Sequence, residues 1–257
     1  MSTPQTPSHP LVVAVAGGTG TVGRHAVSAL RAAGHEARVL TRSRGVDLVT
    51  GRGLDAALAG VDSVIDTSNV STLSATAATE FFRTATGNLL GAAERAGVRH
   101  ILLLSIVGID RMPYDYYAGK VAQEALVEAS AVPWTILRAT QFHEFAEQVF
   151  SQAKAGPLHV APRARVQPIA AREVGRHLSE LAAGSARGRA DDIAGPREER
   201  LDDMVKRYAR RTGHRGWVPA MSLPGKQMKG MRAGYALPAP EALLGTQTFA
   251  DWLDELG

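Results

Sequence analysis

The chain has no cysteine among its 257 residues. This absence excludes disulfide bonds, thiolate zinc sites and cysteine nucleophiles, and it is typical of a protein kept in a reducing compartment. No apolar run approaches the ~20 residues that a bilayer-spanning helix needs. Residues 1–10 also lack the basic and apolar regions of a signal peptide. We therefore expect a disordered tail over residues 1–10, a cytoplasmic protein and no membrane partner.

The sequence has only a small excess of one charge sign, with a formal net charge of +4. The local basic run Lys206–Arg215 resembles segments that contact phosphate in nucleic-acid-binding proteins. However, 24 of the 29 basic residues are arginines spread along the chain, with acidic residues between them. We interpret the run as a solvated helix face and expect no nucleic-acid partner. The sequence also lacks Gly-x-Ser-x-Gly and Walker motifs, which argues against hydrolase and nucleoside-triphosphatase functions.

A glycine-rich turn follows the first apolar segment. Residues 11–16 suit a buried strand, and the next seven residues lead into an amphipathic helix that ends before Gly34. In this context, glycines allow the backbone to approach a pyrophosphate at a helix N-terminus. We therefore predict a dinucleotide-binding turn that consists of Gly17, Gly18, Thr19, Gly20, Thr21, Val22 and Gly23.

Strands and helices alternate after this turn. Strands are expected at residues 36–41, 46–50, 63–67, 100–105 and 134–138, and helices at residues 54–60, 75–96 and 116–130. Such alternation predicts an α/β fold, namely a doubly wound parallel-sheet Rossmann fold with a small C-terminal substrate lobe. Ligands of such sheets bind beyond the strand ends, so we place Thr67, Ser68 and Asn69 among the cofactor contacts.

The pattern changes after residue 140. Helices are expected at residues 142–155, 172–183, 201–212 and 248–253, and a loop at 184–197. Residues 219–245 are rich in Gly, Pro and Met. We expect residues 11–140 plus 166–185 to form an NADP-binding Rossmann domain. Residues 141–165 plus 195–257 then form the small substrate-binding lobe.

The residue after the second strand selects the nicotinamide cofactor in Rossmann sites. An acidic residue there binds the ribose 2′-hydroxyl of NAD, whereas arginine accommodates the 2′-phosphate of NADP. Here the position holds Arg42, followed by Ser43 and Arg44. We therefore predict that the cofactor is NADP(H).

Tyr116 and Lys120 are the predicted catalytic pair. Their i, i+4 spacing places them on one helix face, where the ammonium can hold the nicotinamide ribose and lower the pKa of the phenol. Ser105, at the end of a strand, is expected to bind the cofactor and to hydrogen-bond the same substrate oxygen. Tyr114 and Tyr117 remain rivals for the tyrosine role.

A second interpretation of Lys120 is a simple surface ion pair with Glu124.

Farther along, His143-Glu144 begins like a zinc-protease helix, but Glu147 stands where the motif needs histidine, so we expect no metal. Gln141 and Phe142 are expected to line the binding site of the nicotinamide ring. His143 is either a substrate contact or a satisfied surface histidine.

Several blocks together carry a family resemblance. They are Gly17–Gly23, Thr41–Ser43, Ala59–Val64, Leu104–Gly108, Tyr116 with Lys120 and Glu124, Pro133–Arg138 and Gln167–Ile169. In this order they resemble the NmrA-like atypical short-chain dehydrogenase/reductases over residues 11–180, and more weakly to Trp252-Leu253. The resemblance implies a Rossmann domain for NADP(H), a small carboxyl-terminal lobe, and contact between Lys120 and the nicotinamide ribose.

Two departures from the family pattern concern the cofactor domain. Gly51-Arg52 stands where relatives usually carry a Gly-Asp that meets the adenine, and Glu173 stands where an aspartate is common. The family contains quinone, azo-dye and isoflavone-type reductases as well as redox-sensing regulators. We expect an NADPH-dependent reductase of a small apolar carbonyl, quinone or enone. The alternatives are a non-catalytic NADP(H)-sensing protein and an enzyme like nucleotide-sugar epimerases. The protein is expected to be a monomer or a homodimer.

Overall fold

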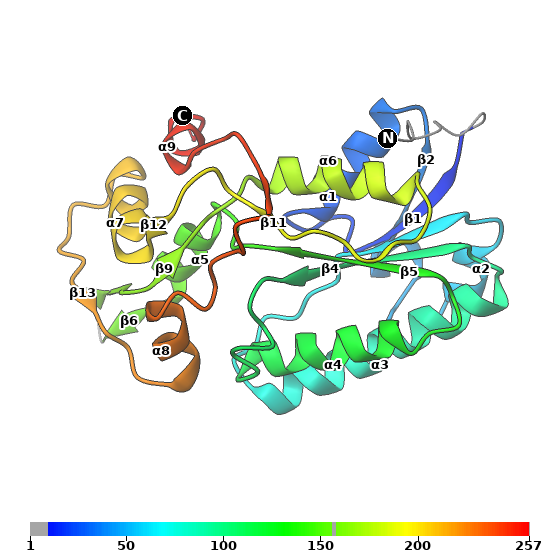
Figure 1. Cartoon of the computed structure of the whole chain (residues 1–257), viewed down its shortest axis with the longest axis horizontal. Coiled ribbons are helices and arrows are strands. Elements are labelled where there is room, and N and C mark those ends of the chain that lie inside the picture. Colours follow the sequence, from blue (N-terminus) through cyan, green and yellow to red (C-terminus); the bar gives the residue numbers. More distant parts are fainter. Residues whose placement is uncertain (1–9, 156–157, 257) are drawn as a thin grey trace. The chain divides into compact units, whose positions relative to one another are not determined.

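The computed structural model describes residues 10–155 and 158–256, and the chain divides into two compact units. The first unit comprises Met1–Ser105, Asp115–Arg138 and Ala171–Ala190, and the second Ile106–Tyr114, Ala139–Ala170 and Asp191–Gly257. Residues 1–9 of the expected tail lie outside the described residues. Each unit is described by itself below, with the element labels of Figure 1.

A parallel sheet forms the centre of the first unit. Its strands lie in the order β2 (Glu36–Leu40), β1 (Val12–Ala16), β3 (Ser63–Asp66), β4 (His100–Ile106) and β5 (Trp134–Ala139), and β10 (Gly188–Arg189) pairs with β5. The pairs β1–β2, β1–β3, β3–β4 and β5–β10 are all parallel. Every residue of β3 is buried, as expected for a strand covered on both faces. The predicted doubly wound α/β fold is confirmed.

Helices cover both faces of this sheet. The helices α3 (Ala75–Arg95) and α4 (Tyr116–Glu128) lie on one face, and α1 (Gly23–Ala32) and α6 (Ala171–Ala182) on the other (Figure 1). The helix α3 buries Ala78, Phe82 and Leu89 at helical spacing. A Cβ atom at Gly119 of α4 would lie 2.7 Å from the carbonyl carbon of Ala78, so glycine allows α3 and α4 to pack closely.

The expected strand at residues 46–50 is wrong. This segment is a loop between the short 3-10 helix η1 (Arg42–Arg44) and α2 (Leu54–Leu58). The Asp47 carboxylate accepts hydrogen bonds from the backbone N–H groups of Val49 and Thr50, at 2.9 and 3.2 Å. The Asn88 amide of α3 donates to the carbonyls of Leu48 and Val49. These side chains take the backbone groups that a strand would need for its ladder.

The second unit consists of short elements. Its helices are α5 (Phe145–Gln152), α7 (Leu201–Arg211), α8 (Lys226–Arg232) and α9 (Phe249–Asp254). Its two-residue strands are β6 (Lys154–Ala155), β7 (Leu158–His159), β8 (Ala161–Pro162), β9 (Arg165–Val166), β11 (Ile193–Ala194), β12 (Glu199–Arg200), β13 (Ala220–Met221) and β14 (Leu243–Leu244). The helix α7 packs against α5 and α9. The Thr248 side chain forms a capping box with Asp251 that begins α9.

Two expectations for the later half of the chain need correction. The segment 184–197, expected as a loop, contains β10 and β11, and Ile193 of β11 pairs with Ala139 at the end of β5. Strands of two residues carry no periodicity, so only their pairing partners reveal them. The helix expected at 142–155 is shorter, because α5 begins at Phe145 and ends at Gln152.

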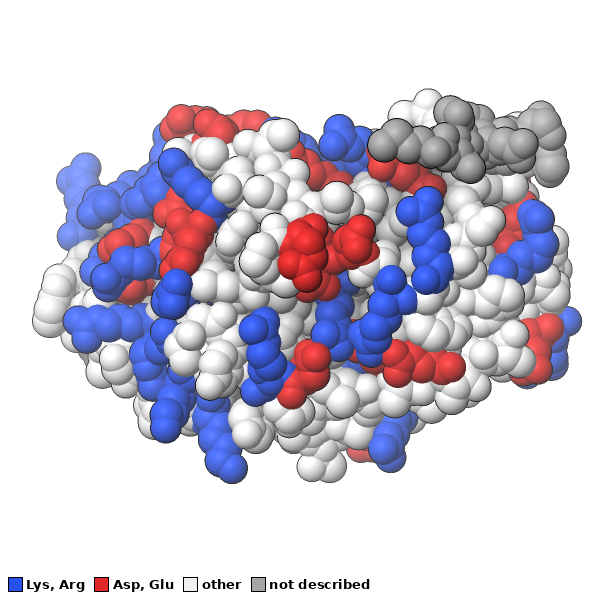
Figure 2. Space-filling view, viewed as in Figure 1, with Lys and Arg blue, Asp and Glu red and all other residues white. Residues whose placement is uncertain are grey.

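The basic run Lys206–Arg215 spans the end of α7. Figure 2 shows Lys and Arg side chains gathered over the segments that Figure 1 labels α7, β13 and α8. Within the run, the Arg207 guanidinium lies 5.1 Å from the ring centroid of Phe249, and Arg211 donates to the Leu253 carbonyl at 3.0 Å. These two arginines therefore tie α7 to α9. None of the helices in the described residues has the length and hydropathy that a membrane span requires.

Candidate cofactor and catalytic site

The glycine turn connects β1 to α1. Gly17 has φ +73°, which favours glycine, and a Cβ atom there would lie 2.5 Å from the Thr67 carbonyl oxygen. A Cβ atom at Gly23 would collide with the Gly17 carbonyl oxygen. Gly18 and Gly23 are buried, whereas Thr19, Gly20 and Thr21 are exposed at the tip of the turn. The turn is thus folded tightly on itself, with exposed backbone just before a helix N-terminus, as anion-binding turns require.

Thr67, Ser68 and Asn69 follow β3, next to the glycine turn. The register pairs Ala16 of β1 with Asp66 of β3, so the two strands end side by side. The Thr67 hydroxyl donates to the Ala16 carbonyl at 2.8 Å, which holds the two strand ends together. The Ser68 side chain is buried, and its hydroxyl has no hydrogen-bond partner among the described residues. A buried hydroxyl of this kind calls for a ligand or a water as its partner.

Arg42, Ser43 and Arg44 form η1, directly after β2. All three are exposed, and the Ser43 hydroxyl lies 2.9 Å from that of Thr41. In the part of the chain that the structure describes, neither Arg42 nor Arg44 forms a salt bridge. By contrast, Arg38 of β2 donates to the carbonyls of Ala57 and Ala59. The two cations of η1 are therefore available to an anionic ligand.

Lys120 is buried inside the first unit, with 4% of its surface exposed. Its ammonium donates to the Leu104 carbonyl at 2.8 Å and to the Gln123 side-chain oxygen at 2.5 Å, and it lies 4.9 Å from the ring centroid of Phe82. Burial lowers the pKa of Lys120 to about 8, although nearby carboxylates act in the opposite direction. The expected surface pair with Glu124 is wrong, since Lys120 lies in the interior.

Tyr116 begins α4 and reaches the loop after β3. Its hydroxyl donates to the Asn69 side-chain oxygen at 2.7 Å, and its ring packs edge-on against Phe82. Burial raises the pKa of Tyr116, and Tyr117 and Asp66 raise it further. The net shift of this pKa is therefore upward, whereas the pairing with Lys120 by itself predicts a downward shift. Of its two rivals, Tyr117 is buried beside Tyr116, and Tyr114 belongs to the second unit, where Lys226 lies over its ring.

Ser105 and Glu124 meet near the end of β4. Burial alone would raise the pKa of Glu124, but hydrogen bonds from Arg138, with smaller effects of Ser105 and Arg189, lower it. The Arg138 guanidinium forms two hydrogen bonds to this carboxylate, at 2.9 and 2.7 Å. The Ser105 hydroxyl is buried, and none of its contacts in the described residues has good hydrogen-bond geometry. This hydroxyl thus retains the capacity to bond a ligand oxygen.

The other predicted residues belong to the second unit. The backbone of Gln141 accepts a hydrogen bond from the Ile169 N–H at 2.9 Å, and Phe142 forms a parallel bridge with Ile169. His143 is fully buried, where its ring contacts Phe249 and Trp252 and its Nε2 lies 3.2 Å from the Gln247 carbonyl oxygen. His143 is therefore a core residue of the second unit rather than a surface histidine.

Sequence reasoning missed three residues that surround Lys120. Asp66, Phe82 and Gln123 come from β3, α3 and α4, and all three are buried. Phe82 appears in the sequence as an ordinary core residue of a helix. Asp66, a carboxylate that follows Val64 and Ile65 in a fully buried strand, is the one detectable signal, because buried carboxylates need partners.

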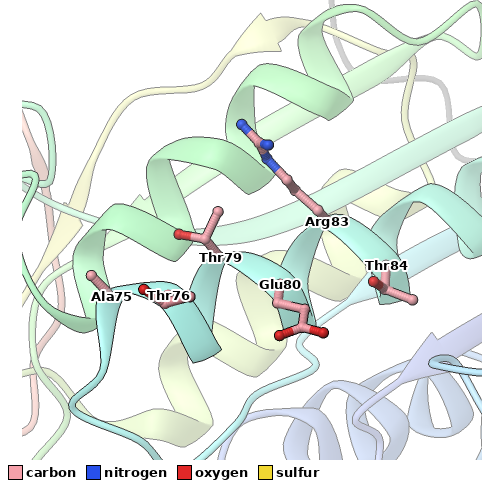
Figure 3. A pocket seen from close by; sticks show the side chains of 6 residues that line it. All are labelled: Ala75, Thr76, Thr79, Glu80, Arg83 and Thr84. Atoms are coloured by element: carbon pink, nitrogen blue, oxygen red, sulfur yellow. The ribbon is translucent and has the colours of Figure 1, made fainter.

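An open hollow lies on the outer side of α3. Figure 3 shows that Ala75, Thr76, Thr79, Glu80, Arg83 and Thr84 line it, all from this one helix. The buried residues Phe82 and Thr86 of the same helix are not part of its lining. This hollow is therefore separate from the cluster around Lys120.

Comparison with known proteins places this site in a family. The model of the NAD(P)H-binding family matches residues 17–174, which is more than half of the chain. The chain belongs to the NAD(P)H-binding family. The match begins at the glycine turn and includes η1, Ser105, Tyr116 and Lys120. This membership agrees with the resemblance to NmrA-like short-chain dehydrogenase/reductases. No curated protein matches the sequence.

Several solved structures share the fold of this NAD(P)H-binding protein. MoeE5 in complex with UDP-glucose and NAD has 17% identity and a TM-score of 0.69, covering 94% of this chain and 97% of that one. The NADPH-dependent quinone oxidoreductase QOR2 of Escherichia coli has 16% identity and a TM-score of 0.66, covering 95% and 99%. The UDP-N-acetylglucosamine 4-epimerase of Bacillus cereus has 16% identity and a TM-score of 0.65, covering 96% of both chains. At these identities the likeness establishes the fold alone.

Proposed function

We propose that this member of the NAD(P)H-binding family is an NADPH-dependent reductase of small apolar carbonyls, quinones or enones. One observation carries the proposal. Within the first unit, Tyr116 contacts the loop after β3, which itself packs on the glycine turn, and Lys120 lies one helical turn beyond Tyr116. This arrangement supports the proposal, because hydride transfer to a carbonyl requires a proton donor near a bound dinucleotide, and Tyr116 is connected to the glycine turn through the loop after β3.

The residues of the first unit fit a nicotinamide dinucleotide. The turn from Gly17 to Gly23 has no room for side chains at Gly17 and Gly23, so its backbone can hold the pyrophosphate. Arg42, Ser43 and Arg44 would hold the 2′-phosphate that distinguishes NADPH from NADH. Thr67, Ser68 and Asn69 would contact the cofactor between these two ends. Gln141, Phe142 and the rest of residues 141–165 and 195–257 would supply the substrate lobe.

NADPH supplies the hydride when it is bound, and the chain supplies the proton and the orientation. The Tyr116 hydroxyl is protonated at neutral pH, so it can donate a proton to the substrate oxygen as negative charge develops there, although burial raises its pKa and so makes it a weaker acid in the cofactor-free protein. The Ser105 hydroxyl would hydrogen-bond the same oxygen. Lys120 would hold the nicotinamide ribose and so fix the reacting face.

The test is turnover with a panel of substrates. Purified protein is mixed with NADPH and, in separate reactions, quinones, azo dyes, enones and UDP-sugars, and the loss of NADPH absorbance or the change in the sugar is followed. We expect quinones or enones to oxidise NADPH faster with the wild type than with Lys120→Ala. Equal rates for the two proteins across the panel would contradict the reductase proposal, and epimerised UDP-sugar would favour the epimerase alternative.

A cofactor-sensing protein is the second candidate. It is favoured by one observation, that Lys120 and Tyr116 are both engaged by other residues of the chain. A sensor would bind NADP(H) and discriminate between its oxidised and reduced forms without turnover. Calorimetric titration with NADP⁺ and NADPH, combined with the substrate panel, separates the two functions.

A further inference from the structure

Gln123 bridges three elements of the first unit with one side-chain amide. It lies on α4, three residues after Lys120, and has no exposed surface. Its nitrogen donates to the Asp66 carboxylate and to the Thr86 hydroxyl, each at 3.0 Å, and its oxygen accepts from the Lys120 ammonium. Because a buried amide is costly without hydrogen bonds, this complete set holds Gln123 in one orientation.

The amide links Lys120 to the loop that is proposed to contact the cofactor. One Asp66 oxygen accepts from Gln123, and the other accepts from the Ser68 backbone N–H at 2.9 Å. Ser68 is followed in the chain by Asn69, whose side-chain oxygen accepts a hydrogen bond from the Tyr116 hydroxyl. Hydrogen bonds thus join Lys120 through Gln123 and Asp66 to Ser68, and the peptide bond from Ser68 to Asn69 connects this set to Tyr116.

Asp66 is the carboxylate that contributes most to stabilising the charged form of Lys120. Two carboxylates, Asp66 and Glu124, favour the charged form of Lys120. Glu124 is shared with Arg138 on β5 and Arg189 on β10, at 2.7 and 3.0 Å, so much of its charge is already compensated. Phe82 and Thr86 of α3 and the Leu104 carbonyl of β4, the other groups against the ammonium or its bridging amide, do not titrate.

We infer that Gln123 is a positioning residue for Lys120, because its amide fixes the ammonium between Leu104 and Asp66 and keeps it charged at neutral pH. The inference rests on the proposed role of Lys120 at the nicotinamide ribose. A neutral or displaced Lys120 would make weaker hydrogen bonds to ribose hydroxyls, so Gln123 would act on cofactor binding without touching the cofactor.

The direct test is titration of Lys120 by NMR in the cofactor-free protein. The chain has only five lysines, so carbon-13-labelled lysine gives few signals, and the Lys120 signal is the one absent from Lys120→Met. We expect a wild-type midpoint near the pKa of about 8. Gln123→Met should move the midpoint down by about one pH unit, since it removes the bridge but keeps the volume. Gln123→Glu should move it up, since it adds a negative charge beside the ammonium.

The downward shift in Gln123→Met is the decisive feature. A merely structural Gln123 would leave the Lys120 midpoint unchanged in this variant, and that result would overturn the inference. The upward shift in Gln123→Glu checks only that residue 123 faces the ammonium, because an added negative charge there raises the pKa of Lys120 whatever the role of the amide. Thr86→Val is the matched control, because it removes one hydrogen-bond partner of Gln123 but leaves the bridge to Asp66. The titration midpoint of Lys120 in this variant should equal that of the wild type. If Gln123→Met does not fold, Asp66→Asn replaces it, with a downward shift expected and an unchanged midpoint contradicting the bridge.

NADPH affinity separates this inference from the proposed function. The pH at which NADPH binding weakens should move with the Lys120 midpoint in each variant. If the midpoints shift as expected but NADPH affinity does not follow them, Gln123 positions Lys120 as inferred and the proposed ribose contact is wrong.

Discussion

The two cationic regions of the candidate site hold their charges in opposite ways. Arg42 and Arg44 of η1 are exposed and form no salt bridge within residues 10–155 and 158–256. Lys120 of α4 is buried and bonded to Leu104 and Gln123. A hydrated cation can exchange water for an anionic ligand at little structural cost, whereas a buried cation needs its partners at all times. The exposed arginines are therefore suited to selecting a ligand. The buried lysine contributes to the stability of the fold as well as to the candidate site.

The buried part of the site should be the most sensitive to substitution. Gly23→Ala places a Cβ atom against the Gly17 carbonyl oxygen, so we expect loss of detectable NADPH binding and a destabilisation of roughly 1–3 kcal/mol. Calorimetry and urea unfolding measure these effects. Gly87→Ala is the matched control, because nothing lies within 4 Å of its Cβ position and α3 is helical there. It should stabilise the protein by roughly 0.5–1 kcal/mol. Equal effects of the two substitutions would contradict the tight turn.

Lys120→Met should separate turnover from folding. The variant keeps the apolar stem but leaves the Leu104 carbonyl and Gln123 without the ammonium, so we expect a destabilisation of about 1–3 kcal/mol. Loss of the proposed ribose contact should reduce kcat/KM by about 100-fold. Arg111→Lys, outside the first unit, serves as the control. A Lys120→Met protein with wild-type kcat/KM would show that this buried cation has only a structural role.

The exposed cations should affect only the choice of ligand. Arg42→Ala should weaken NADPH binding by about 10-fold and leave NADH binding unchanged, because only the 2′-phosphate is lost as a partner. The thermal midpoint should not change, since Arg42 makes no salt bridge in the described chain. Arg95→Ala is the control, as its guanidinium is already paired with Asp55 at 2.6 Å. A parallel loss of NADH affinity would contradict the phosphate role and weaken the contrast with Lys120.

A change of pH should act on Lys120 in two opposite ways. Its pKa falls from the usual 10.5 to about 8 on folding, so between these values the unfolded chain binds more protons than the folded one. The free energy of unfolding should therefore rise from about pH 7 to about pH 9, by about 1 kcal/mol relative to Lys120→Met. NADPH affinity should fall over the same range as the ammonium is lost. Urea unfolding measures the free energy of unfolding at the two pH values, and calorimetry measures NADPH affinity. If stability and affinity both rise or both fall, the deprotonation of Lys120 is not their cause.

Local features of this protein could be predicted well from the sequence. The glycine turn, the arginines after β2 and the shared helix face of Tyr116 and Lys120 depend on neighbours within a few residues. The strand expected at 46–50 failed because Asp47 and Asn88 bind the backbone there. The strands β10 and β11 were missed because they exist only by pairing with other segments. The roles of the predicted site residues remain proposals.

The sequence by itself determined the fold class, the family and the types of side chain that could serve a nicotinamide cofactor. Only the tertiary structure decided the electrostatic state of those side chains. Asp66 and Gln123 lie 57 residues apart in the chain and meet around Lys120, and burial raises the pKa of Tyr116 where its spacing from Lys120 had indicated the reverse. Spacing along a helix specifies which residues share a face, but burial and the approach of distant charges specify what their protons do.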